Sequence, residues 1–590
     1  MSAHPSAGRP IARRLAEFAG LAILLFVARF VWRGGLAPQS DQECHIGGIA
    51  LDVLAHGVRF PLLVYAPNEY DNGSFASGLL TAGAFVALGR RLLALKLVTH
   101  LIVAAGAVAT LSLLRAVLTE VGITARRARG VAVLVLLVAL ALAPLEVTAL
   151  SMYGVGNHAE GCAIDMLLLA LFASRWHLRS TGRTVVFWAL VGGALYLNKG
   201  TMLVAPLLAL AELTLVPRAP RRLLAAVAGL LLGAAPELVV IAQRHGMGWA
   251  TMAAKAERTA PAFPRLFVDD LLTLAEHRGV LLATWGAALA AGIVRLARTW
   301  RRAGATPPLA LALVVGVSVL HLAALGVMAQ GGLDAYAIYG YPTVSVLLAL
   351  LLATAVARMS ARSGERAGAA TGAAAVALTL ALYWPRAAET DGAALAALWQ
   401  NRAGAACSWR FAEGFGREWQ YGLAPPGRAR DAHVIDRCRA LSEADQRLDC
   451  VGGMARELHW RQGGRVAGAP PAELDDAERR AYAFHYGTHR KGDAAACGDF
   501  ADAELAATCA AAVRLECLVF ADQLARIGGG RGLGAPRCAL PEPPIDGFWA
   551  QRRRELLARG AGAGPRGAAG DEGELGACGP VFAACYPAEP

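Results

Sequence analysis

Two carboxylates stand just beyond the first long apolar run of this sequence. Asp41 and Glu43 open the segment DQECHIGGIALDVLAHG, which continues as an amphipathic stretch. A carboxylate in this position can act as a general base toward a hydroxyl or an amine, or bind a divalent cation such as Mg²⁺ or Mn²⁺. Glu43 has a second interpretation, because Ser40 followed by an acid three residues later forms a helix capping box.

Basic side chains at the ends of other apolar runs form a second set of candidates. Lys96 and His100 are four residues apart, so they share one face of a helix. Lys199 stands at the end of a later apolar run, in LYLNKGTMLVAP. Together with His158, which stands just before the apolar run 161–175, they predict contacts with a lipid-linked phosphate. The alternatives are that each lysine extends its ammonium to the lipid headgroups, and that His158 is a solvated loop residue.

The composition indicates that the elements carrying these side chains are membrane helices. Of 590 residues, 56% are apolar and only 17% are charged, with a mean hydropathy of +0.43. Soluble domains carry about 25% charged residues. The net charge of +12 does not indicate a nucleic-acid binder. The basic residues are spread over short loops between apolar runs, as in the cytoplasmic loops of membrane proteins.

Spans of about 20 mostly apolar residues predict an all-α, polytopic bundle. About eleven runs qualify, at 15–33, 92–117, 131–150, 161–175, 185–198, 200–216, 223–241, 278–297, 308–329, 341–357 and 369–385. With the N-terminus cytoplasmic, every inner loop is arginine-rich and the C-terminal part lies outside. If the run 74–89 were also a span, every later loop would change sides and the basic loops would lie outside. We therefore interpret this run as a re-entrant or interfacial helix within the first outer loop, 36–91.

Cysteines concentrate in the C-terminal third. Nine of the eleven lie beyond residue 400, on the side predicted to be extracytoplasmic, where disulfides persist. Cys438 and Cys450 are twelve residues apart, and so are Cys497 and Cys509. We predict two disulfide-stapled helical hairpins within a domain at 386–556, because one straight helix would hold such cysteines about 18 Å apart. Further disulfide candidates, Cys578 and Cys585, stand in a flexible Gly/Ala-rich tail at 557–590.

The order of these features resembles the GT-C glycosyltransferases, over roughly 10–385. In that family, which includes protein O-mannosyltransferases and the aminoarabinose transferase branch, an acidic motif in the first outer loop is catalytic. The resemblance implies this role for Asp41, with Glu43 second. It further implies substrate or phosphate contacts for four features of the sequence. These are the basic residue that opens the second span (Lys96), an acid at the head of a later span (Asp165 or Glu160), a Lys-Gly step (Lys199 with Gly200) and a Tyr/Pro stretch (Tyr339 and Tyr341 in AYAIYGYPTV).

Two departures from the family pattern are visible. Gln42 splits the acidic pair, and the segment YAPNEYDNGSF stands where the aminoarabinose branch has Lys-Pro-Pro. Tyr339 and Tyr341 have the alternative of an interfacial aromatic belt.

The predicted function is transfer of a sugar from a polyprenyl-phosphate carrier to a glycan, lipid or protein acceptor, on the extracytoplasmic face of the inner (plasma) membrane. The 1–385 part would be the GT-C-like domain. The alternatives are a transporter of lipids or solutes, and a non-catalytic assembly or sensor protein whose cysteine hairpins bind a partner. A transporter would show an inverted repeat, and the sequence shows no such symmetry.

Overall fold

The elements of secondary structure in the described part of the computed structural model are helices, joined by turns and short loops. The described residues are 8–32, 41–59, 65, 73–143, 159–198, 200–215, 220–243, 263–303, 308–328, 333–383, 428–441, 444–461, 470–487 and 494–513.

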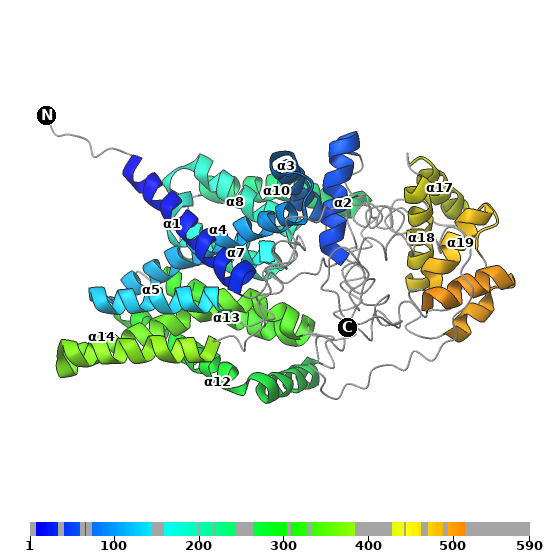
Figure 1. The fold of residues 1–590 in the computed structure, drawn as a ribbon. Helices are drawn as coiled ribbons and strands as arrows, with labels where there is room; N and C mark the ends of the chain where they lie inside the picture. Colours follow the sequence, from blue (N-terminus) through cyan, green and yellow to red (C-terminus); the bar gives the residue numbers. More distant parts are fainter. Residues whose placement is uncertain are drawn as a thin grey trace.

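A bundle of long apolar helices makes up the N-terminal part of the chain (Figure 1). Each of the eleven predicted runs coincides, wholly or for most of its length, with one of these helices. They are α1 (Gly8–Phe26) with the π-helix η1 (Val27–Trp32), α4 (Leu92–Glu120), α5 (Arg126–Ala141), α7 (Ala159–Ala173), α8 (Thr181–Leu197), α9 (Thr201–Leu215), α10 (Pro220–Gln243), α12 (Phe263–Ala303), α13 (Leu309–Met328) and α14 (Leu333–Tyr383). The short 3₁₀ helix η3 (Trp176–Arg179) joins α7 to α8.

Length and hydropathy make this an integral membrane protein. Four helical segments in the described part of the chain are long and apolar enough to cross a bilayer, namely Leu93–Glu120, Pro220–Ala242, Gly279–Arg302 and Gly340–Tyr383. Others, such as Thr181–Leu197 and Thr201–Thr214, are apolar but shorter. The last long segment is two helices joined at Gly364, whose φ of +84° lies outside the helical region. The total of eleven spans stays a prediction.

Small residues let helices of the bundle approach closely. Helices α8 and α10 pack along their length, and a Cβ added at Gly192 or Gly233 would overlap the backbone of the other helix. Interfaces of this kind are typical of membrane helices, where packing rather than hydrophobic exclusion drives association. Helix α4 lies at the centre of the bundle, in contact with α1, α5, α7, α13 and α14.

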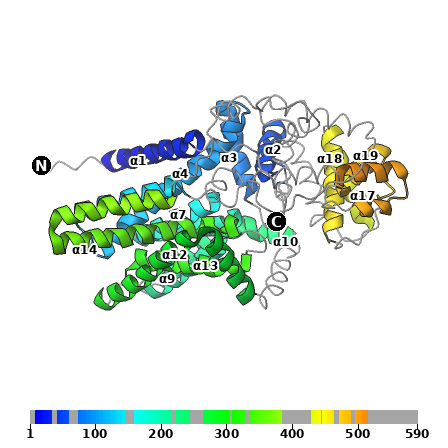
Figure 2. The ribbon, with the colours of Figure 1, turned by 60° about the horizontal axis from the view of Figure 1, so that its bottom comes forward.

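Two shorter helices lie at one end of the bundle. Helix α2 (Asp41–His56) runs across the direction of α5 and α14, and α3 (Ser74–Leu88) packs between α2 and α4 (Figures 1 and 2). The helix expected at 74–89 is confirmed, and its 15 residues are fewer than the roughly 20 that a span needs. Its place at the membrane surface remains a prediction.

The C-terminal helices form a small disulfide-linked unit. The predicted first hairpin is present, because Cys438 in α17 (Arg428–Arg439) is bonded to Cys450 in α18 (Ala444–Arg461), with Cα atoms 5.4 Å apart. The second pair, Cys497 and Cys509, joins η6 (Ala494–Asp499) to the helix Ala503–Val513. Both predicted pairings are therefore confirmed, while Cys578 and Cys585 lie outside the described residues.

Helix α19 (Asp476–Gly487) is tied to the first hairpin by an ion pair. Arg439 donates from Nε and Nη2 to the two Glu478 carboxylate oxygens, over 2.9 and 2.7 Å. These hydrogen bonds raise the pKa of Arg439 above its usual value. Glu478 also accepts from the Asp475 amide, and Asp475 accepts from the Glu478 amide, which together make a capping box. The unit lies at the end of the bundle opposite the N-terminus (Figures 1 and 2).

Candidate functional site

Two buried carboxylates of α7 are held by threonines from neighbouring helices. Thr99 of α4 donates its hydroxyl hydrogen to Glu160 Oε1 over 2.6 Å, and Thr201 of α9 donates to Asp165 Oδ1 over 2.7 Å. Glu160 is 3% exposed and Asp165 is 1% exposed. Asp165 Oδ2 is buried and has no hydrogen-bond partner among the described residues. Acids placed this way inside an apolar bundle are costly and mark functional sites.

The connection between α8 and α9 lies directly on the helix that carries these acids. Asn198 ends α8, and its Oδ1 accepts from the Gly200 amide over 2.9 Å. The Asn198 side chain rests on Gly161, where an added Cβ would overlap its amide group. Lys199 itself is outside the described residues. Its two neighbours nevertheless place this stretch of chain beside Glu160 and Asp165.

The segment that carries α2 and α3 reaches the same end of the bundle. Gly73, at the start of α3, contacts the carbonyl of Leu197, the last residue of α8, so closely that a Cβ would not fit. Gly78 of α3 is likewise packed against Ile49 of α2. Three parts of the sequence therefore converge here: the loop carrying α2 and α3, the start of α7, and the α8–α9 connection.

The two basic candidates of α4 have different surroundings. Lys96 is completely buried, one turn from Thr99. His100 faces α1, where its Nε2 donates to the Ala22 carbonyl over 2.9 Å and its ring meets Phe26 and Phe30 edge-on. Lys96 therefore lies one turn from the threonine that binds Glu160, whereas His100 is oriented toward α1. Shared phosphate binding by Lys96 and His100 stays a prediction.

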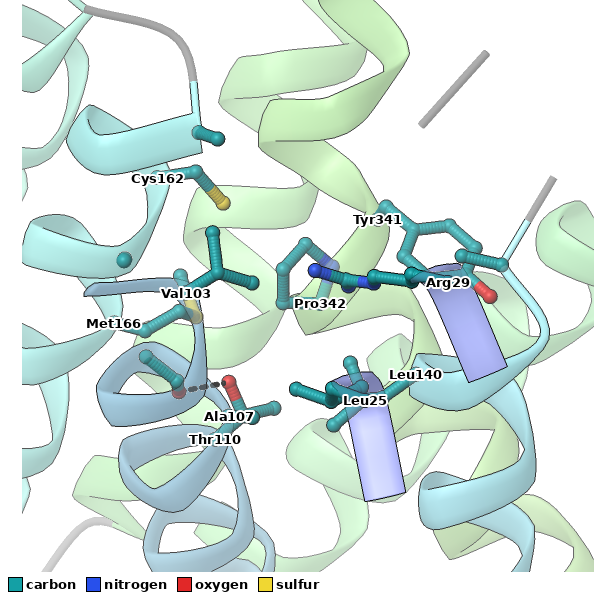
Figure 3. Close-up of a pocket in the computed structure, with 14 residues that line it drawn as sticks. Leu25, Arg29, Val103, Ala107, Thr110, Leu140, Cys162, Met166, Tyr341 and Pro342 are labelled. Carbon is teal, nitrogen blue, oxygen red and sulfur yellow. Dashed lines mark hydrogen bonds between the residues drawn. The ribbon is translucent and has the colours of Figure 1, made fainter. Parts of the chain in front are cut away.

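A cavity of about 50 Å³ lies in the bundle close to the Thr99–Glu160 hydrogen bond. Its lining includes Val103, one turn from Thr99, and Ala159 and Cys162 of α7. Arg29 is the charged residue of the lining, and Figure 3 shows its guanidinium directed toward Val103 among the other lining side chains. An apolar space holding one buried guanidinium can accept an anionic group attached to an apolar chain.

Arg29 was not among the residues singled out from the sequence. It lies in η1, within the first apolar run, and is 4% exposed. A π-helical turn is uncommon and is frequent at functional sites. An arginine inside an apolar run is the signal that could have identified it.

Tyr341 lies in the interior and not in an interfacial belt. It is 2% exposed, donates its hydroxyl hydrogen to the Ala139 carbonyl over 2.6 Å, and lines the cavity beside Pro342. Its ring packs against Trp285 and Tyr383. The aromatic-belt alternative is therefore wrong for Tyr341.

A polar network links α2 to the residues that follow it. Arg59 Nε donates to both Asp52 oxygens over 3.1 and 3.0 Å, and the Tyr65 hydroxyl donates to Asp52 Oδ2 over 3.3 Å. His45 Nε2 donates to the Tyr65 carbonyl over 2.9 Å. Burial, aided by the Asp52 charge, raises the pKa of Tyr65 to about 12. Sequence patterns did not point to Asp52, because its partners follow in an irregular segment.

A second buried pair lies elsewhere, between α9 and the link from α7 to α8. His177 Nε2 and Glu212 Oε2 are 2.9 Å apart, and the His177 ring stacks on Phe172. Both side chains are buried. This pair joins helices and is separate from the acids of the candidate site.

The side chains of several predicted site residues lie outside the described part of the structure. Asp41 and Glu43 belong to the first turn of α2, but their side chains are outside the described part of the structure, as is that of Tyr339 in α14. His158 and Lys199 lie outside the described residues altogether. Among the side chains that are described, no three His, Cys, Asp or Glu residues group as metal ligands.

Comparison with known proteins yields one structural likeness. No family model matches the chain, and no curated protein matches it. The crystal structure of ArnT from Cupriavidus metallidurans in the apo state is similar to 88% of this chain over 81% of its own length, with 15% sequence identity and a TM-score of 0.39. This score and identity are below the likeness that establishes a shared fold, so the chain is assigned to no family.

Proposed function

We propose that this protein is a membrane glycosyltransferase that moves a sugar from a polyprenyl-phosphate carrier to an acceptor, at the end of the bundle that bears α2 and the disulfide-linked unit. The observation that carries the proposal is the group of buried charged residues at this end. Lys96, Glu160 and Asp165 are almost wholly buried within apolar helices, next to the cavity that holds Arg29. Burial of this many ionisable groups is costly and is retained where it serves a reaction or a ligand.

The chemistry assigns these groups to two tasks. Phosphate is the leaving group, and its negative charge grows as the bond from the anomeric carbon to the phosphate oxygen breaks. Arg29 and Lys96 would stabilise that charge, since guanidinium and ammonium groups form strong hydrogen bonds to phosphate. The apolar lining of the cavity would receive the first part of the polyprenyl chain.

The acceptor must lose a proton as its oxygen or nitrogen attacks the anomeric carbon. In the proposal, Asp41 takes this proton as general base, with Glu43 as the second candidate. The carrier then leaves as polyprenyl phosphate. Glu160 and Asp165, fixed by Thr99 and Thr201, would accept hydrogen bonds from sugar hydroxyls. Asp41 and Glu43, in the first turn of α2, would supply oxygen ligands to a divalent cation such as Mg²⁺ or Mn²⁺.

The test is donor turnover by the purified full chain in nanodiscs. Polyprenyl phosphates carrying different hexoses and pentoses would be supplied singly, and released polyprenyl phosphate would be measured by chromatography. Turnover of at least one donor is expected. Asp41→Asn should abolish it with the thermal unfolding midpoint unchanged, and full activity of this variant would overturn the assignment of the base.

Carrier binding can be measured apart from turnover. Arg29→Met should weaken binding of polyprenyl phosphate by about 100-fold, the scale of losing a charged hydrogen bond in an apolar site. Arg14→Met is the matched control, because Arg14 is an exposed arginine of the preceding helix α1. Equal affinity in both variants, or no turnover of any donor despite tight binding, would favour the non-catalytic alternative.

A further inference from the structure

A second cavity, of about 160 Å³, opens between α12 and α14, away from the candidate site. Its walls are mixed in character. Leu347 and Leu351 of α14 and the small residue Gly292 of α12 form an apolar side, and Arg295, Arg298 and Arg358 contribute three guanidinium-bearing side chains.

The three arginines have no acidic counterpart in the described part of the chain. None of them forms an ion pair there, and Arg302 adds a fourth positive charge one turn further along α12. Like charges brought together by two helices destabilise the protein unless an anion neutralises them. The arrangement therefore suits an anionic ligand.

Arg295 is held in place more firmly than an arginine that simply extends into solvent. Its Nη2 donates to the Val121 carbonyl at the end of α4 over 2.8 Å, and its Nε is buried with no hydrogen-bond partner among the described residues. The nearby acid Glu120 is occupied, because its oxygens accept from the amides of Ala310 and Leu311. The guanidinium thus keeps unsatisfied donor capacity at the cavity.

The surroundings point to a ligand that comes from the bilayer. Val294, also in the lining, and its neighbour Ile293 are 48% and 46% exposed, and Trp300 further along α12 is 47% exposed. Exposed aliphatic residues followed by a tryptophan and several arginines are typical of a helix leaving the hydrocarbon core for the headgroup layer. A cavity here meets phosphate at its basic side and acyl chain at its apolar side.

We infer that the cavity between α12 and α14 binds the phosphate of an anionic membrane lipid, with Arg295, Arg298 and Arg358 as its ligands. Basic pockets between spanning helices on the cytoplasmic side recognise such headgroups. Guanidinium groups suit a phosphate diester because they donate two parallel hydrogen bonds. The site is independent of the proposed transfer reaction, which would occur at the opposite end of the bundle.

Lipid binding to the purified full chain tests the inference, measured by native mass spectrometry with phosphatidylglycerol, cardiolipin, phosphatidylcholine and inorganic phosphate as separate probes. The expected result is tighter binding of the two anionic lipids than of phosphatidylcholine. Replacing all three arginines by Gln should weaken anionic-lipid binding by about tenfold or more. The control Arg126→Gln/Arg362→Gln/Arg366→Gln removes the same charge from exposed positions of the same basic end and should leave binding unchanged.

Two outcomes would overturn the inference. One is an equal loss in the control, which would make the effect one of total charge. The other is saturation by inorganic phosphate with no preference for anionic lipid, which would assign the site to a soluble anion. If the Gln variant fails to fold, Arg295→Lys/Arg298→Lys/Arg358→Lys keeps the charge while losing the paired donors. It should still bind anionic lipid more weakly than the native chain, and undiminished binding would contradict the site.

Discussion

The hydroxyl of Thr201 donates to Asp165 Oδ1 over 2.7 Å, and so ties the first residue of α9 to the middle of α7. The other oxygen of the same carboxylate is buried and without a hydrogen-bond partner among the described residues. One half of this group is thus structural, and the other half is available to a ligand.

Substitutions of Asp165 and of Thr201 distinguish the structural role of this carboxylate from its role in binding a ligand. Asp165→Asn keeps the shape and an oxygen that accepts from Thr201, but loses the charge and one acceptor. If the proposed function holds, donor turnover should fall by about 100-fold or more, as for other groups that contact reacting substrate. Thr201→Val removes only the supporting hydrogen bond, and should cost about 1–3 kcal/mol in stability with a smaller loss of turnover. A Thr201→Val variant impaired as severely as Asp165→Asn would show that Asp165 acts mainly in packing.

The contact between Gly73 and Leu197 predicts a sharp difference between two glycines of the same region. Gly73→Ala adds a methyl group against the Leu197 carbonyl, so α3 must shift away from the α8–α9 connection. We expect a destabilisation of about 1–3 kcal/mol, the usual cost of overpacking, together with reduced donor turnover. Gly83→Ala, within α3 and facing open space, is the control. It should be neutral or slightly stabilising, because alanine favours helix by about 1 kcal/mol. Indistinguishable unfolding midpoints of the two variants would refute this contact.

The raised pKa of Tyr65 predicts that the segment around α2 loses stability in alkaline solution. Burial raises its pKa from 10.0 to about 12 in the folded protein. Below pH 10 the phenol is neutral in both states, and its contribution to stability is complete. As the pH rises from 10 toward 12, the unfolded state ionises first, so the free energy of unfolding falls, by about 2–3 kcal/mol in all.

Thermal unfolding of the native chain and of Tyr65→Phe across this pH range provides the measurement. The variant loses the hydroxyl's bonds with the Arg59 amide and Asp52, so it should begin less stable. It should then lose less stability between pH 10 and pH 12. Parallel curves for the two proteins would exclude Tyr65 as the source.

The two disulfides predict a redox-dependent stability confined to the C-terminal unit. Each closes a loop with a sequence separation of 12, for which the chain-entropy estimate is about 3 kcal/mol. Cys438→Ser/Cys450→Ser should lower the unfolding free energy of this unit by about that amount. Hydrogen exchange in α18 and α19 would detect it, with the α8 and α10 amides as the internal control. Labelling of Cys438 by a maleimide in the untreated native chain would contradict the bond.

The sequence predicted best the features that depend on local spacing. Cysteines twelve residues apart can meet only if the chain turns between them, and the pair Cys438 and Cys450 does so. The apolar runs likewise coincide with helices, because a long apolar stretch has few other stable forms in a bilayer.

Features that depend on which helices become neighbours were not predictable in this way. A threonine such as Thr99 or Thr201 carries no signal of its partner, so the pairs with Glu160 and Asp165 appear only in the packed bundle. The spacing of Lys96 and His100 correctly places them near each other on α4, but cannot show that α1 is packed against His100. Arg29 was overlooked because it was counted as part of an apolar run.

The close packing of α8 and α10 has a consequence for how the chain is assembled. The backbones meet at Gly192 and Gly233, yet α9 is synthesised between the two helices and packs against α13 and α7 as well as α8. During biosynthesis α8 must therefore enter the membrane with its glycine face uncovered and stay so until α10 emerges. Because α9 is made between them, the glycine-bearing faces of α8 and α10 can meet only after both α9 and α10 have been synthesised, so this contact forms late in the assembly of the bundle.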